Sequence, residues 1–183
     1  MEYELYRSYR KTISISINED GKVIVKAPRF ASRVAIERFL SDKEDWINKH
    51  IEKQLLNKQY RESVDKLTEL ELKQYASILK SELPEMLDEY SKRLGVKYGR
   101  VTIRAQHTRW GSCSGKGNLN FNCLLAATPE SVTRYVVVHE LCHLLEMNHS
   151  KRFWALVESV LPDYKKERKW LKENGSKLIS RLP

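Results

Sequence analysis

The sequence predicts an α+β fold in which strands and helices occupy separate stretches of the chain. Two regions alternate apolar and polar residues with the period of a half-buried strand, one near the N-terminus and one between about residues 96 and 125. Charged stretches with apolar positions at helical spacing lie between these regions and after the second of them. Neither an internal repeat nor a low-complexity tract interrupts this order.

The first region predicts antiparallel strands at the N-terminus. Three isoleucines at alternate positions share one face of a strand: Ile13, Ile15 and Ile17. Asn18–Gly21 has the composition of a turn, and Lys22–Ala27 forms the expected return strand, which Pro28 ends.

Helices are expected over residues 32 to 95. Ser32 can cap a first helix, and Ser41 with Glu44 has the capping-box spacing for a second. Pro84 is expected to kink the charged stretch between about 60 and 94 or to divide it into two helices. Gly95 is a suitable C-terminal stop.

The second alternating region predicts a small sheet, with two of its strands joined at Gly115–Gly117. A helix is expected from about Glu130 through the histidines, another from Phe153 to about Val160, and a last one opened by Pro162. We therefore expect a single domain over residues 1–183, with an N-terminal lobe of strands and helix over about 1–60 and a core over 60–183.

Composition and charge limit the classes of partner. The formal net charge of +9 favours an anionic partner, such as nucleotide phosphates, nucleic acid or an acidic substrate. The excess is spread along the chain, and we find no basic patch interleaved with aromatic residues, so nucleic acid is the less favoured partner.

The sequence favours a cytoplasmic location. No apolar run approaches the ~20 residues that span a bilayer, and the first residues lack the apolar stretch of a secretory signal, so no membrane partner is expected. The three cysteines, Cys113, Cys123 and Cys142, lack the spacing of a disulfide framework or a cysteine-only zinc site.

Residues 139–143 form the pattern HExxH. On a helix, His139 and His143 lie one turn apart, about 40° round the axis, so both imidazoles can reach one ion. Glu140 lies near enough to take a proton from water at that ion without being a ligand. An amphipathic helix with ordinary histidines is the alternative, but the preceding hydrophobic run and a nearby third histidine favour a metal centre. Zinc, one ion per chain, is the expected metal, although three histidines suit other divalent ions.

Two residues compete for the position of third ligand. On a straight helix Glu146 would stay on the ligand face, but a further turn away from the ion. A helix that ends near Met147 or Asn148 could bring His149 back, because Asn148 tolerates the left-handed conformation of such an ending. We favour His149, with Glu146 as the alternative ligand or as a partner that orients a histidine.

Five polar residues are candidates for substrate binding: Arg109, Asn120, Asn122, Lys151 and Arg152. Arg109 could contact an anion or oxyanion, or form a surface ion pair. Asn120 and Asn122 share one face of the strand expected in residues 118–125 and could line the cleft, although structural roles explain them equally well. Lys151 and Arg152 could hold phosphates or simply begin a helix.

Three segments together resemble the YgjP-like metallopeptidase domain family, which is of the zincin type: TRWGSCSGKGNLNFNCLL, YVVVHELCHLLEMNHSKRFW and PDYKKERKWL. The similarity runs from about residue 96 to 171, and the strand-rich start also fits. The resemblance implies a zincin-like catalytic core, with a small mixed sheet whose edge strand lies beside the active-site helix. In zincins such a strand pairs with a peptide through backbone groups, and residues 118–125 are the best candidate for it. It also implies the histidines at 139, 143 and 149 as ligands and Glu140 as general base. The chain departs from HExxHxxGxxH proteases in carrying Glu146 where they have a glycine.

Three functions follow in order of preference. The first is a zinc-dependent metallopeptidase that uses metal-activated water with a glutamate general base. The second is a metal-dependent pyrophosphohydrolase of nucleoside triphosphates such as UTP, an activity also associated with the resembling family and suited by the charge of +9. The third is a non-catalytic nucleic-acid-binding module, which would bind in a salt-dependent manner without metal.

Overall fold

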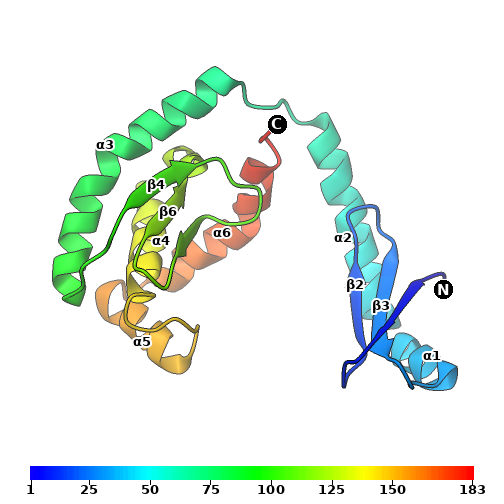
Figure 1. Cartoon of the computed structure of the whole chain (residues 1–183). Coiled ribbons are helices and arrows are strands. Elements are labelled where there is room, and N and C mark those ends of the chain that lie inside the picture. The colour runs from blue at the N-terminus through cyan, green and yellow to red at the C-terminus, as the bar shows by residue number, and fades with distance from the viewer. The chain divides into compact units, whose positions relative to one another are not determined.

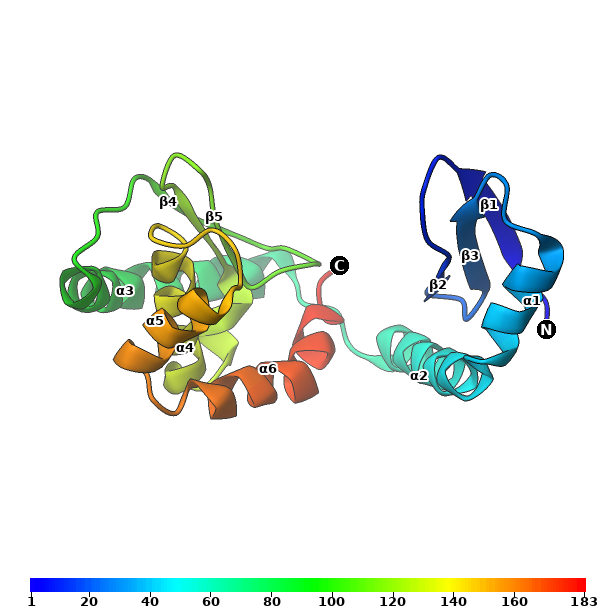
Figure 2. The same ribbon diagram turned by 90° about the horizontal axis from the view of Figure 1, so that it is seen from below.

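The computed structural model describes residues 1–183 and divides into two compact units, Met1–Val64 and Asp65–Pro183. Both combine helices with a small three-stranded mixed sheet, so the α+β class is confirmed (Figures 1 and 2). None of the helices combines the length and apolarity that crossing a membrane requires.

The sheet of the N-terminal unit contains three strands: β1 (Glu4–Ser8), β2 (Ser14–Ile17) and β3 (Val23–Pro28). The hairpin of β2 and β3 is antiparallel, as predicted, with Ile15 opposite Val25. β1 lies on the other side of β3 and pairs with it in parallel, which makes the sheet mixed and corrects the expectation of antiparallel strands alone. Parallel pairing places the ends of β1 and β3, Ser8 and Pro28, side by side.

Two helices cover this sheet's apolar residues: α1 (Arg33–Ser41) and α2 (Glu44–Ser63). Ser32 caps α1 by accepting a hydrogen bond from the Ala35 amide at 3.1 Å, as predicted. The predicted capping box at Ser41 is wrong, because Ser41 is the last residue of α1 and α2 has no side-chain cap. Burial of Val25, Ile36 and Ile47 gives this unit its own core.

The C-terminal unit begins with one long helix, α3 (Glu69–Leu94). Thr68 and Glu71 form the capping box at its start. The helix continues through Pro84, so the expected division into two helices is wrong. Gly95 ends it with a left-handed φ of 66°, as predicted.

The second sheet has the order β4-β6-β5: β4 (Val101–Arg104), β5 (Gly111–Cys113) and β6 (Leu119–Asn122). β6 is parallel to β4 and antiparallel to β5, and the glycine-rich turn joins β5 to β6 as expected. A short 3₁₀ segment, η1 (Cys123–Ala127), leads from β6 towards the remaining helices: α4 (Glu130–Cys142), α5 (Lys151–Val160) and α6 (Tyr164–Ile179). Phe121, Leu141 and Phe153 are fully buried in the core that the sheet and helices share.

Candidate metal centre

The HExxH residues lie at the C-terminal end of α4. His139 and Glu140 are in its last turn, and His143 is the C-cap residue. The helix therefore ends about a turn earlier than the position near Met147 that was considered from the sequence. Leu144 and Leu145 resemble a continuing apolar stripe, but their amides bond to the carbonyls of Leu141 and Cys142 in a turn.

The return of the chain brings His149 to the other histidines. Ser150 caps α5 by accepting a hydrogen bond from the Phe153 amide at 3.3 Å, and His149 directly precedes this cap. No residue other than glycine has a positive φ, so the expected left-handed conformation at Asn148 is wrong. The start of α5, rather than a left-handed residue, positions His149.

Three imidazoles converge at this point. One ring nitrogen from each of His139, His143 and His149 lies within 4.8 Å of the other two. The Nε2 atoms of His139 and His149 are 3.0 Å apart. Ligands at zinc–nitrogen distances of 2.0–2.1 Å in tetrahedral geometry are about 3.4 Å from one another, so side-chain shifts on the order of 1 Å would let the three nitrogens bind one divalent ion.

One backbone contact orients a ring of the cluster. Nδ1 of His143 lies 3.1 Å from the carbonyl oxygen of Glu146, and donating its proton there leaves Nε2 unprotonated as a ligand. Glu146 thus contributes its main chain, and its carboxylate is not part of the three-residue cluster. Nδ1 of His139 is buried and has no hydrogen-bond partner.

Aromatic rings support the histidines. The Phe153 ring lies 4.9, 4.6 and 4.8 Å, centroid to centroid, from the rings of the three cluster histidines. Trp154 stacks with His149 at 5.7 Å and with Tyr164 at 5.4 Å, centroid to centroid, and the guanidinium carbon of Arg168 lies 4.4 Å from its ring centroid. These contacts fix the imidazole planes by packing.

Burial keeps the imidazoles of His139 and His143 in the neutral form that binds metal. Burial is the main cause that lowers the pKa of His139 to about 3, and the positive charge of His143, His149 and Arg168 adds to it. Burial also lowers the pKa of His143, against the hydrogen bond to Glu146. A cation therefore competes with few protons for these nitrogens.

Glu140 lies in a tight, dry environment. Its residue is 5% exposed, and its Oε2 atom is buried without a hydrogen-bond partner. Burial raises the pKa of this carboxyl to about 8, while Arg109 opposes the rise. The carboxylate packs on Gly111 of β5, where a Cβ atom would lie 2.6 Å from Oε1. Glu140 thus places an unpartnered, buried carboxyl on the same helix end as His139 and His143, and a carboxyl with such a raised pKa is a candidate for proton transfer.

The strand order corrects one expectation about substrate binding. Residues 118–125 were expected to supply the edge strand, but β6 is the central strand and is paired on both sides. The strand that contacts α4 and keeps a free edge is β5, which carries Gly111 against Glu140. Ser112 and Cys113 complete this short edge strand.

The candidate substrate residues occupy different environments. Arg109 is exposed and close enough to Glu140 to affect its pKa. Asn120 is half-buried and donates to the Ser112 hydroxyl at 3.3 Å. Lys151 and Arg152 are exposed in the first turn of α5, directly after His149 and its cap.

The expectation that Asn122 contacts substrate is wrong, because a substrate cannot reach this side chain. The residue is 0% exposed, and its side-chain nitrogen donates to the carbonyls of Gln106 and Arg109 at 2.7 and 3.0 Å. Its side-chain oxygen accepts from the Leu124 amide at 3.2 Å. Asn122 therefore holds the loop that carries Arg109 in place.

Sequence reasoning missed two residues of the centre. Gly111 makes room for Glu140, and the available signal was a glycine within a predicted strand, which often marks a close approach. Arg168 contacts Trp154 from α6 and lowers the pKa of His139. It comes from a separate helix, in a highly charged stretch whose spacing carries no signal for this contact.

The chain is similar to a family of metallopeptidase domains and to a curated enzyme. A family model described as "YgjP-like, metallopeptidase domain" matches residues 11–73 and 53–174. The UTP pyrophosphatase of Escherichia coli (strain K12) is 28% identical over 135 residues, which cover 70% of this chain and 81% of that protein.

Two solved structures also align with part of the chain. The metallopeptidase zymogen of Pyrococcus abyssi abylysin has 26% identity and a TM-score of 0.45, with 49% of this chain and 92% of that chain covered. The metallopeptidase zymogen of Methanocaldococcus jannaschii jannalysin has 16% identity and a TM-score of 0.46, with 51% and 96% covered.

Proposed function

Because the chain belongs to the YgjP-like family, which makes it a metallopeptidase-like hydrolase, we propose that it is a zinc-dependent metallopeptidase with a zincin-like active site. The observation that carries the proposal is the convergence of three imidazole nitrogens within 4.8 Å of one another. His139 and His143 lie at the end of α4, which also carries the buried Glu140, and His149 lies just before the cap of α5. Family membership implies a divalent metal, and the all-histidine donor set suits zinc.

In this proposal three histidines bind the metal and Glu140 transfers the proton. His139, His143 and His149 hold the ion, which when bound supplies Lewis-acid chemistry and acidifies a water molecule. Glu140 takes the proton from the attacking water and passes it to the leaving group. Burial favours the proton on Glu140 once it has been taken, because the charged carboxylate is poorly solvated there.

The peptide preference is supported by β5. Its free edge lies beside α4 and can pair with an extended substrate through backbone groups, so the scissile bond would be presented next to Glu140. We propose Arg109 as the contact for the developing oxyanion and retain Asn120 as a contact near this strand. Both assignments rest on position, since Arg109 is exposed next to the carboxylate.

A second candidate, hydrolysis of nucleoside triphosphates to monophosphate and diphosphate, is favoured by the relative named UTP pyrophosphatase. The exposed cations Lys151 and Arg152 directly follow a metal-binding residue of the proposed site and would bind phosphate oxygens. The same three histidines and Glu140 would serve this reaction, with the attack at phosphorus instead of carbon.

One experiment separates the two substrates. Metal-loaded protein is incubated with unfolded peptides and, separately, with UTP and other nucleoside triphosphates, each with and without a chelator. Peptide cleavage that stops with the chelator and returns with zinc supports the peptidase. Chelator-sensitive release of diphosphate without peptide cleavage would replace it with the second candidate. Inactivity of the loaded protein on both substrate classes would contradict both.

The third ligand can be tested by metal affinity. We expect His149→Ala to weaken zinc binding by more than about 100-fold, because even residues that only orient a ligand contribute 10–100-fold. Affinity is measured by competition with a chromophoric chelator. His107→Ala is the matched control, since that histidine is exposed and outside the cluster. Unchanged affinity in His149→Ala with a loss in Glu146→Ala would exchange the two assignments.

A further inference from the structure

The N-terminal unit presents two exposed aromatic rings at one end of its sheet. Phe30 is 91% exposed and Tyr9 is 89% exposed, more than any other large hydrophobic residue of the chain. Tyr9 follows β1 and Phe30 follows β3, and the parallel pairing of these strands brings the two segments to the same end of the sheet (Figure 1). We call residues 7–11 and 29–33 the aromatic tip.

The aromatic tip is held in shape by arginine contacts. Nη1 of Arg7 donates to the carbonyls of Pro28, Arg29 and Ala31 at 3.3, 3.0 and 2.8 Å. Arg29 donates to the Tyr9 hydroxyl at 2.7 Å, and its guanidinium carbon lies 5.6 Å from the Tyr9 ring centroid. The rings are therefore presented on a fixed backbone, which lowers the entropic cost of binding a ligand.

The sequence around these two rings contains cations but no acidic residues. Neither Leu5–Asn18 nor Gly21–Ile36 contains an Asp or a Glu, although the whole chain has 24. The two stretches together hold seven cations: Arg7, Arg10, Lys11, Lys22, Lys26, Arg29 and Arg33. Five of the seven lie in the aromatic tip itself: Arg7, Arg10, Lys11, Arg29 and Arg33. This placement corrects the interpretation that the chain has no basic patch interleaved with aromatic residues.

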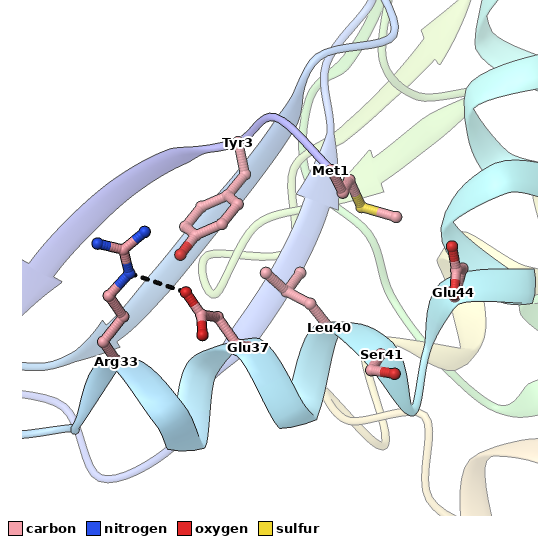
Figure 3. Close-up of a pocket in the computed structure, with 7 residues that line it drawn as sticks. All are labelled: Met1, Tyr3, Arg33, Glu37, Leu40, Ser41 and Glu44. Atoms are coloured by element: carbon pink, nitrogen blue, oxygen red, sulfur yellow. Dashed lines mark hydrogen bonds and ion pairs between the residues drawn. The ribbon is translucent and has the colours of Figure 1, made fainter.

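The cations of the aromatic tip differ in whether they form ion pairs. Arg33 pairs with Glu37 at 2.8 Å in a pocket that includes Glu44, so its charge is partly neutralised (Figure 3). Arg10, Lys11 and Arg29 take part in none of the ion pairs of this unit, which involve Arg33, Lys58 and Arg61.

We propose that the aromatic tip binds single-stranded nucleic acid, with bases stacking on Tyr9 and Phe30 and phosphates contacting Arg10, Lys11 and Arg29. Binding of a single strand needs aromatic rings on which unpaired bases stack and cations that contact the backbone phosphates. The aromatic tip provides both. A duplex hides those faces. An anionic membrane fits less well, since Tyr9 lies between Ser8 and Arg10, its hydroxyl is bonded to Arg29, and Phe30 directly follows Arg29.

The test uses the full chain and fluorescently labelled oligo(dT) and oligo(U) of about 12 nucleotides, within the usual site size. Affinity is measured by fluorescence anisotropy between about 50 and 200 mM salt. We expect binding to both or to one of them, with a competing duplex and phosphatidylserine vesicles each binding more weakly. Tyr9→Ala/Phe30→Ala is expected to lose about tenfold or more in affinity, whereas Tyr9→Phe/Phe30→Tyr keeps it.

Charge variants provide an independent reading. Arg10→Ala/Lys11→Ala is expected to reduce the slope of log affinity against log salt by about 1.4, at about 0.7 per lost phosphate contact. Lys49→Ala/Lys53→Ala, two exposed cations on α2, is the matched control and should leave the slope unchanged. The proposal is overturned if neither oligonucleotide binds at the lowest salt, if ring removal leaves affinity unchanged, or if vesicles bind and oligonucleotides do not.

Discussion

The Glu140→Gln variant is expected to keep its metal and lose its hydrolytic turnover. Glutamine has nearly the shape of glutamate and fits the same slot against Gly111, but its amide cannot accept the proton of the attacking water. General acid–base catalysis contributes about 10²–10⁴-fold to rate, so kcat should fall by that order. The variant is assayed on whichever substrate class the native protein hydrolyses.

Two measurements accompany this assay. Zinc content is expected to match that of the native protein, because the three histidine nitrogens do not include Glu140. The midpoint temperature of thermal unfolding is expected to be unchanged or slightly higher, since the buried Oε2 has no hydrogen-bond partner to lose. Full turnover in Glu140→Gln would show that another group accepts the proton.

Gly111→Ala is expected to impair turnover although Gly111 lies outside the HExxH segment. An alanine Cβ at this position would lie 2.6, 2.7 and 2.9 Å from Oε1, Cγ and Cδ of Glu140, closer than side-chain contacts allow. Gly111 does not have a positive φ, so the backbone can accept alanine and the Glu140 side chain must move instead. A misplacement of about 1 Å at a catalytic group can reduce kcat by about 10²-fold.

The matched control for this substitution lies a few residues further along the same hairpin. Gly115 has no atom within 4 Å of an added Cβ and no positive φ, so Gly115→Ala should behave as the native protein. We expect Gly111→Ala to lower kcat more than it changes KM, with zinc content retained. Native kcat in Gly111→Ala would mean that Glu140 has room to move without losing its alignment.

Local sequence patterns predicted the hairpin of β2 and β3, the cap at Ser32 and the stop at Gly95, because each depends on residues close together in the chain. The parallel position of β1 depends on which edge of β3 is free, and alternation does not encode this choice. For the same reason β6 was mistaken for an edge strand, although it lies between β4 and β5. Pro84 stays within α3 because tertiary packing outweighs the local penalty.

In the candidate site, too, local features could be predicted from the sequence and tertiary contacts could not. The spacing of His139 and His143 follows from helix geometry and needs no tertiary information. The place where α4 ends could not be predicted, because Leu144 and Leu145 continue an apolar pattern while the chain already turns. The space beside Gly111 and the stack of Arg168 on Trp154 join residues far apart in sequence, so they appear only in the folded chain.

The Phe153 ring beneath all three histidines has a consequence for how metal enters and leaves the protein. Its ring is fully buried and touches every imidazole of the cluster, so the donors are set by the hydrophobic core itself. Binding and removal of the metal are then expected to be reversible and to leave the fold unchanged. Small metal-dependent domains differ, because they unfold when a chelator removes their ion. A stripped sample should retain its circular dichroism spectrum and regain its ion on simple addition of zinc, without any refolding step.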